Sequence, residues 1–226
     1  MDRVAIKSLA KEKIKGNKWN LIWPLLVISI ISSILTNLLG GGNLVTINAD
    51  SIKSLQNMSY EAIMNAAVVN PRAEAINTVV SIVIGIITAG YVNYVLTFVR
   101  NGSASIDDIM DTIKKKWLQI LLANILVGII VFAFSLLLVI PGIVRALAYA
   151  MVTYIIVDSD LEAKDALKKS REMMNGYKWD YFVFNLSFIG WFLLVPFTFG
   201  IILIWLIPYM NVAEALYYEK LKEIRG

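Results

Sequence analysis

The sequence of 226 residues contains no cysteine and no histidine. The missing cysteine excludes disulfides and thiol nucleophiles, and the two absences together exclude zinc sites of the Cys/His kind. Acid–base chemistry by imidazole is excluded as well. The sequence also has no P-loop, no glycine-rich nucleotide fingerprint and no pair of carboxylates at a defined spacing. We therefore expect a protein that is not an enzyme and that holds no metal and no cofactor.

Charged residues are scarce, at 17% of the chain, against about 25% in an average soluble domain. Hydrophobic residues make up 58%. This composition predicts an all-α, polytopic membrane protein. The net charge of +4 does not indicate nucleic-acid binding, because the Lys and Arg residues lie beside apolar runs instead of forming a separate basic domain. We expect anionic membrane lipids to be their partners.

Six apolar runs are candidates to cross about 30 Å of hydrocarbon. They are residues 19–39, 78–99, 117–140, 142–157, 181–196 and 201–218. Their order predicts six transmembrane helices in three hairpins, within a single membrane domain over residues 1–226. The fourth and fifth runs are short for full spans. The first run is longer than the apolar core of a signal peptide, so we expect it to be retained as an anchor.

The distribution of Lys and Arg supports this topology. Eighteen of the 21 lie in four segments, residues 1–18, 100–116, 158–180 and 219–226. Six spans place all four segments on one side of the membrane, and basic segments favour the cytoplasm. We therefore expect a multi-pass protein with both termini cytoplasmic and with an outer loop at residues 40–77.

Three cytoplasmic segments are predicted to form amphipathic helices. The first ends at Gly16, and the other two begin with capping-box patterns at Ser105 and Ser159. Each is followed by a Lys-Trp pair that starts a span; the pairs are Lys18-Trp19, Lys116-Trp117 and Lys178-Trp179. Because indole prefers the headgroup level and Lys reaches phosphate, we expect these pairs to be interfacial anchors.

The recurrence of an amphipathic helix, a Lys-Trp pair and two spans predicts a threefold internal repeat. Its units are residues 1–101, 102–158 and 159–226. The alternative explanation is that unrelated spans use the same anchoring residues.

One intramembrane arginine, Arg145, follows a break at Pro141-Gly142. The break predicts the turn of the second hairpin, which places Arg145 about 4 to 5 Å inside the outer end of the next helix. In one interpretation, Arg145 closes the hairpin by bonding free carbonyls near Pro141. In the other, its guanidinium binds the phosphate or carboxylate of a lipid headgroup or other anion.

Other polar residues lie within the predicted spans; they are Asn93, Asn124, Asn185, Asn211 and Glu214. Amides at membrane depth most often bond between helices. The alternative is a polar path for a substrate, with proton coupling at Glu214. A shared cavity containing these groups would favour the path.

Four stretches resemble a known family. They are LVIPGIVRALAYAM at 138–151, SREMMNGYKW at 170–179, SFIGWFLL at 187–194 and WLIPY at 205–209. They resemble the bacterial integral-membrane family catalogued as domain of unknown function nine-seven-five. The resemblance implies a polytopic protein of the bacterial plasma membrane without an assigned activity, although the outer loop is longer than expected of the family. The arrangement also looks like the membrane domains fused to some bacterial glycerophosphodiester phosphodiesterases, which implies lipid handling by analogy.

Three hypotheses of function follow. The first is a non-enzymatic membrane protein that binds lipid or an amphiphilic or peptide substrate, as an accessory to transport or envelope homeostasis. The second is a small secondary carrier, and the third is a membrane-embedded enzyme that modifies lipids. A protein partner or a homo-oligomer is compatible with all three.

Overall fold

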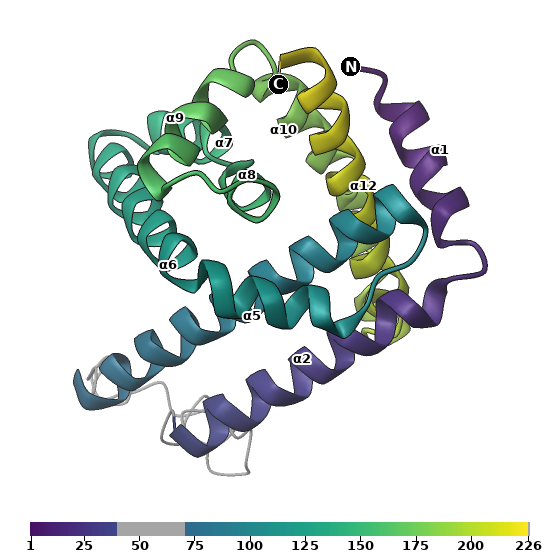
Figure 1. The fold of residues 1–226 in the computed structure, drawn as a ribbon, viewed down its shortest axis with the longest axis horizontal. Helices are drawn as coiled ribbons and strands as arrows, with labels where there is room; N and C mark the ends of the chain where they lie inside the picture. The colour runs from purple at the N-terminus through teal and green to yellow at the C-terminus, as the bar shows by residue number, and fades with distance from the viewer. Residues whose placement is uncertain (40–70, 226) are drawn as a thin grey trace, which may run out of the picture. The chain divides into compact units, whose positions relative to one another are not determined.

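The computed structural model describes residues 1–39 and 71–225, and within these ranges the chain forms helices and no strands. The chain divides into two compact units, Met1–Leu26 with Ile86–Gly226, and Val27–Gly85. The helices are α1 (Arg3–Ile14), α2 (Lys18–Leu39), α5 (Pro71–Asn101), α6 (Ile106–Leu137), α7 (Val139–Ala148), α8 (Val152–Asp158), α9 (Ala163–Met173), α10 (Lys178–Leu186), α11 (Ile189–Phe192), η1 (Pro196–Thr198) and α12 (Ile202–Arg225), as Figure 1 shows.

Four of the described segments are long and apolar enough to cross a membrane. They are Lys18–Asn37, Ala75–Asn101, Ile106–Leu136 and Val139–Asp158, and they coincide with the first four predicted spans. The fifth and sixth predicted spans, residues 181–196 and 201–218, fall in α10, α11, η1 and α12, which are not among the four. The described residues are thus all-helical and include the apolar segments of a membrane protein.

The predicted outer loop, residues 40–77, is only partly within the described chain. Residues 40–70 lie outside it. Residues 71–77 are helical, because α5 begins at Pro71. Proline suits the first position of a helix, where its missing N–H and its fixed φ cost nothing.

The turn between α6 and α7 is not at Pro141-Gly142, as predicted, but at Leu138. Leu138 is a single extended residue, with φ −164° and ψ 146°, between the two helices. Pro141 lies in the first turn of α7, where no intrahelical donor is needed. Gly142 is buried, and a Cβ there would overlap Ser135 Oγ of α6 and lie 3.0 Å from Ser135 Cβ. Glycine therefore permits the close packing of α7 on α6.

Two short helices each bury one face, as expected of amphipathic helices. In α1, the side chains of Ile6, Ala10 and Ile14 are buried, and the helix lies along α12 (Figure 1). In α9, the buried residues are Ala163, Ala166, Leu167, Ser170 and Met173.

The capping pattern at Ser105 is present, since the Asp108 carboxylate accepts from the Ser105 N–H at 2.8 Å. The capping box predicted at Ser159 does not form, because α9 begins four residues later, at Ala163, with Glu162 as its N-cap.

An aromatic cluster fills the space between α10 and α12. The ring centroids of Phe184 and Tyr217 are 5.0 Å apart, those of Phe184 and Phe188 are 5.3 Å apart, and those of Phe188 and Tyr209 are 5.5 Å apart. All four side chains are at most 2% exposed. Tilted and edge-to-face rings at these distances are favourable beyond their burial, so this cluster ties the short helix α10 to α12.

Candidate functional site

Arg145 lies on α7, half-buried, with its guanidinium carbon 4.3 Å from the centroid of the Phe134 ring on α6. This is cation–π geometry. The bonds to carbonyls near Pro141 that one interpretation required are absent from the described residues. The stacking holds the side chain across the α6–α7 hairpin and leaves its N–H donors for an anion, so the headgroup role stays a prediction.

The tryptophans of the three Lys-Trp pairs are exposed. Trp19 and Trp179 are each 73% exposed and Trp117 is 48% exposed. Lys18 and Lys178 are the first residues of α2 and α10. Exposed indoles at helix starts, next to a lysine, fit the anchoring role.

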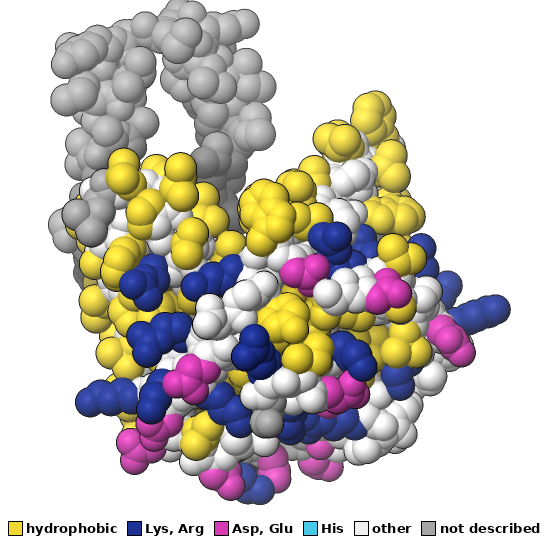
Figure 2. Space-filling model, turned by 90° about the horizontal axis from the view of Figure 1, so that it is seen from above, with side chains coloured by type: hydrophobic (Ala, Val, Ile, Leu, Met, Phe, Trp, Pro, Cys, Tyr) yellow, Lys and Arg dark blue, Asp and Glu magenta, His cyan; other side chains and the backbone are white. Residues whose placement is uncertain are grey.

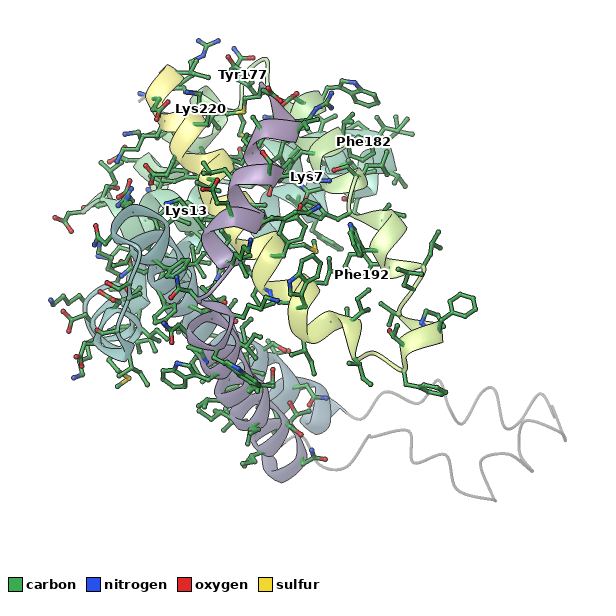
Figure 3. All side chains as sticks on the ribbon, turned by 90° about the vertical axis from the view of Figure 1, so that its right-hand side faces the viewer. Lys7, Lys13, Tyr177, Phe182, Phe192 and Lys220 are labelled. Atoms are coloured by element: carbon green, nitrogen blue, oxygen red, sulfur yellow. The ribbon has the colours of Figure 1, made fainter. Side chains whose placement is uncertain are left out.

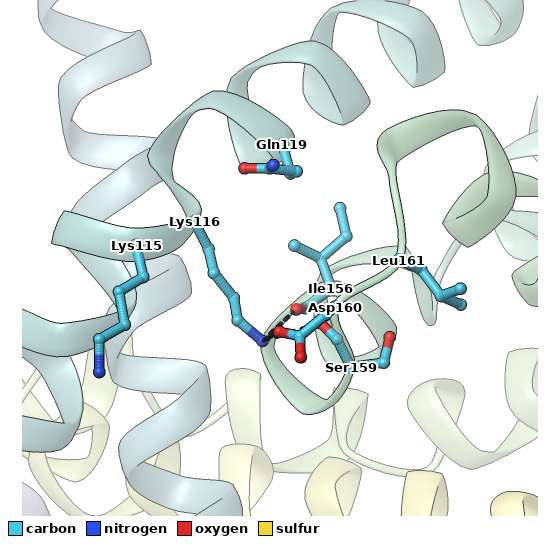
Figure 4. A pocket seen from close by; sticks show the side chains of 7 residues that line it. All are labelled: Lys115, Lys116, Gln119, Ile156, Ser159, Asp160 and Leu161. Carbon is cyan, nitrogen blue, oxygen red and sulfur yellow. Dashed lines mark hydrogen bonds and ion pairs between the residues drawn. The ribbon is translucent and has the colours of Figure 1, made fainter.

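Lys116 differs from the other two lysines because it binds the protein. Its Nζ donates to the carbonyl oxygens of Ile156 at 3.0 Å, Val157 at 3.1 Å and Ser159 at 2.8 Å, and it lies 3.5 Å from a carboxylate oxygen of Asp160 (Figure 4). An ammonium group has three donors, so all of them are used. Lys116 caps the C-terminal end of α8 and is not the free lipid anchor that the sequence predicts.

A groove runs between α6 and the start of α9, with a volume of about 440 Å³. Its α6 wall is apolar, and its α9 side carries charge; the lining residues are Leu118, Gln119, Leu122, Ile125, Leu126, Glu162, Ala163 and Lys164. We call it the α6–α9 groove.

A smaller polar hollow of about 130 Å³ adjoins the α6–α9 groove at Gln119, which lines both (Figure 4). Lys115, Lys116 and Asp160 are among its other lining residues. A polar hollow that continues into an apolar groove has the form required to hold an amphiphile, with a headgroup at one end and a chain along the other.

The predicted polar path is not assembled from the amides. Asn93 of α5 donates to the Asp108 carbonyl of α6 at 3.1 Å, which confirms a bond between helices. Asn185 and Asn211 each donate to a carbonyl four residues earlier in their own helix. Asn124 is exposed.

Glu214 of α12 accepts a hydrogen bond from the Tyr181 hydroxyl of α10 at 3.3 Å. Asn185, one turn after Tyr181, donates to the Tyr181 carbonyl and not to Glu214. The carboxylate therefore joins α10 to α12, and none of the four predicted asparagines bonds to it in the described chain.

An ion cluster that was not predicted from the sequence lies at the ends of α5, α8 and α12. The Asp158 carboxylate, 7% exposed, lies 2.6 Å from Arg100 Nη1 and 2.7 Å from Lys222 Nζ, and it accepts from the Tyr218 hydroxyl at 2.8 Å. Arg100 also reaches Glu219 at 2.6 Å. A buried acid directly after an apolar span was the available signal, because such a group needs a cationic partner.

The lysines of α1 also face the protein. Lys7 Nζ lies 4.1 Å from the Phe188 ring centroid and donates to the Ser187 carbonyl at 3.2 Å, while Lys13 Nζ donates to the Val99 carbonyl at 2.8 Å. Figure 3 shows both on the helix that runs along α12. Burial, and to a lesser degree the charge of Lys11, lowers the pKa of Lys7. These two lysines join α1 to the helices beside it.

The described surface keeps many other basic groups. On the face drawn in Figure 2, Lys and Arg side chains alternate with Asp and Glu, and uncharged hydrophobic patches adjoin them. The acidic groups offset part of the positive charge, so this face is a mixed surface and not a continuous basic one.

Comparisons with known proteins find one family. The model of a family described as "Protein of unknown function (DUF975)" matches residues 1–146 and 129–225. No curated protein and no solved structure matches the chain.

Proposed function

Since the chain belongs to this family of unknown function, we propose from its structure that it is a non-enzymatic protein of the bacterial plasma membrane that binds a phospholipid or similar amphiphile. The α6–α9 groove with its polar end carries the proposal. In this role it would serve transport or envelope homeostasis as an accessory protein.

The proposed ligand lies with its acyl chain along Leu118, Leu122 and Ile125 of α6. The α6 segment from Trp117 onward belongs to a candidate span, so the groove would open toward hydrocarbon, where an acyl chain enters without loss of hydration. Lys115 lines the polar hollow, and Lys164 lines the α9 side of the groove. Lys115 already pairs with Asp111 at 2.6 Å, which leaves Lys164 as the freer cation for a phosphate.

The proposed topology has six spans, with α10–α11 and α12 as a third hairpin and both termini in the cytoplasm. Large apolar side chains in the link between α11 and α12 support it, since Phe197 is 82% exposed and Phe199 is 95% exposed. Such exposure is costly in water and is favourable in lipid. The threefold repeat also belongs to the proposal. Two of its three units share a feature that supports it, because Gly16 and Gly176 both have positive φ and each precedes by two residues a helix that starts with Lys-Trp.

Native mass spectrometry of the protein, released from membranes in mild detergent, tests the proposal. Leu122→Trp fills the groove, and Ile129→Trp places the same side chain on the same helix, two turns further along, at a position that does not line the groove. We expect the wild type and Ile129→Trp to retain a phospholipid and Leu122→Trp to lose it. Arg145→Ala examines the predicted headgroup contact on α7. Equal retention in the wild type and Leu122→Trp, or no retained lipid in the wild type, would overturn the groove assignment.

The carrier and the lipid-modifying enzyme have no comparable support. A carrier needs polar groups that face a shared cavity, whereas Asn93, Asn185 and Asn211 donate to separate backbone carbonyls. An enzyme needs a reactive group beside its substrate, and the described lining of the groove is mainly aliphatic.

A further inference from the structure

Asn124 stands apart from the other asparagines of the apolar helices. It lies in the candidate span Ile106–Leu136, seven residues after Trp117, which is about 10 Å along the helix axis. Its side chain is exposed. Asn93, Asn185 and Asn211 each donate to a backbone carbonyl, whereas Asn124 has no hydrogen bond to any described residue.

An amide at this depth needs a partner, because hydrocarbon provides neither donors nor acceptors. A change of rotamer could direct one N–H to the Ile120 carbonyl, four residues earlier. The amide oxygen would still lack a donor, because every backbone N–H within the helix is already bonded. The missing partner must therefore come from outside α6.

The surroundings of Asn124 allow another helix to approach. Gly128, one turn later, has no atom beyond its own stretch of helix backbone within 4 Å of the position where a Cβ would lie. Leu121 and Phe132 lie on the same side of α6, three residues before and eight after Asn124, and Phe132 is 66% exposed. We call these four residues the Asn124 face. A glycine beside a polar side chain is a favourable contact point between membrane helices.

We propose that the Asn124 face binds the same face of a second copy of this chain, in a two-fold dimer whose Asn124 amides hydrogen-bond to each other. A carboxamide carries both a donor and an acceptor, so it is complementary to itself. In a two-fold interface the same residue of each copy can meet at the axis. A lipid chain could cover Phe132 but offers nothing to the amide.

The Asn124 face and the α6–α9 groove border each other on α6. Leu122 and Leu126 of the groove lining lie about 160° around the helix from Asn124 at 100° per residue, whereas Ile125 lies at the edge of the Asn124 face. A dimer through Asn124 and Gly128 would leave Leu122 and Leu126 uncovered. Substitutions at Asn124 and at Leu122 therefore test dimerisation and lipid binding separately.

The lack of cysteine in the chain allows a direct test by single-cysteine cross-linking in lipid vesicles. Gly128→Cys places a thiol on the proposed axis, and Ile129→Cys places one on the neighbouring exposed position, 61% exposed, a quarter turn away. Under copper-catalysed oxidation we expect a covalent dimer from Gly128→Cys and at least tenfold less from Ile129→Cys. Equal yields, or no dimer from Gly128→Cys, would overturn the proposal.

Photobleaching of single labelled molecules at high dilution in vesicles gives a second readout that leaves Gly128 in place. The wild type is expected to bleach in two steps, and Asn124→Leu in one. A wild type that bleaches in one step, or an Asn124→Leu variant that keeps two, would also contradict the dimer. Asn185→Leu is the matched control, because its amide bonds within its own helix, and it should remain dimeric.

Discussion

The connection from α1 to α2 and the connection from α9 to α10 are built alike. Each passes through a glycine in the left-handed region, with φ +93° at Gly16 and +83° at Gly176. Two residues later, a helix begins with Lys-Trp. A tyrosine from a later helix then binds the third helical residue, since Tyr94 reaches Asn20 and Tyr217 reaches Asp180.

The two connections differ in the atom that the tyrosine binds. Tyr94 donates to the backbone carbonyl of Asn20 at 2.6 Å, and that carbonyl lacks a helical donor because the residue four positions later is Pro24. Tyr217 donates to the Asp180 side chain at 3.0 Å, which also lies 3.6 Å from Arg3. The first hydrogen bond provides a donor to a backbone carbonyl that proline leaves unpaired, and the second provides a donor to a carboxylate. Similar sequences at the two connections therefore use a tyrosine for different purposes.

The largest effect in this comparison is expected from Tyr94→Phe. It removes a half-buried hydrogen bond and leaves the Asn20 carbonyl without a protein donor, which should cost about 1 to 3 kcal/mol of unfolding free energy. Denaturant unfolding in detergent measures it. Adding Pro24→Ala should restore most of the loss, because residue 24 regains an N–H. A double variant as unstable as Tyr94→Phe alone would show that the proline is not the cause.

Asp180→Ala is expected to cost slightly less, about 1 to 2 kcal/mol, because it leaves the buried Tyr217 hydroxyl without its acceptor. The same unfolding assay applies. Asn20→Ala is the matched control at the equivalent position. It should change stability by less than about 0.5 kcal/mol, since Tyr94 binds the backbone there. Equal losses of unfolding free energy in Asp180→Ala and Asn20→Ala would show that the two tyrosines do not differ in binding a side chain at one position and the backbone at the other.

Alanine at Gly16 or Gly176 is expected to cost about 1 kcal/mol in each case, because an L side chain disfavours positive φ. No neighbouring atom obstructs a Cβ at either site, so the two losses should be similar. Gly190→Ala, in α11 with equally open surroundings, should be neutral or stabilising. Unequal losses at Gly16 and Gly176 in thermal unfolding would show that the connections are not equivalent.

The smallest expected loss of stability is that of Lys116→Met, compared with Lys18→Met. Lys116→Met removes the cation at the C-terminal end of α8, worth about 0.5 to 1 kcal/mol. Lys18→Met should have no effect on unfolding, because Lys18 has no hydrogen bond or ion pair within the described chain. The hydrogen exchange of α8 amides reports the loss locally. Unchanged exchange in Lys116→Met would contradict the capping role.

The helices themselves were largely predictable, because apolar runs and amphipathic periods are local signals. The first four spans and the amphipathic character of α1 and α9 follow from them. The position of the α6–α7 turn could not be predicted in this way, because proline suits the start of a helix as well as a break. Whether Pro141 starts or breaks a helix depends on the contact of Gly142 with Ser135.

The partners of polar groups were harder to predict because they lie far apart in the chain. Asp158 meets Arg100 and Lys222, and Tyr94 meets a carbonyl 74 residues away. A basic residue at a membrane border looks the same in sequence whether it faces lipid or caps a helix, as Lys116 does. The α6–α9 groove likewise depends on how two distant helices pack.

Photo-cross-linking with a phospholipid that carries a photoreactive acyl chain tests the lipid-binding proposal most directly. The purified protein in vesicles is irradiated, and the labelled peptides are mapped. The proposal predicts adducts concentrated on Leu118, Leu122 and Ala163 that decrease when unlabelled phospholipid competes. Adducts spread evenly over exposed apolar residues such as Ile140 and Phe197, insensitive to competition, would show that the groove is ordinary lipid-facing surface.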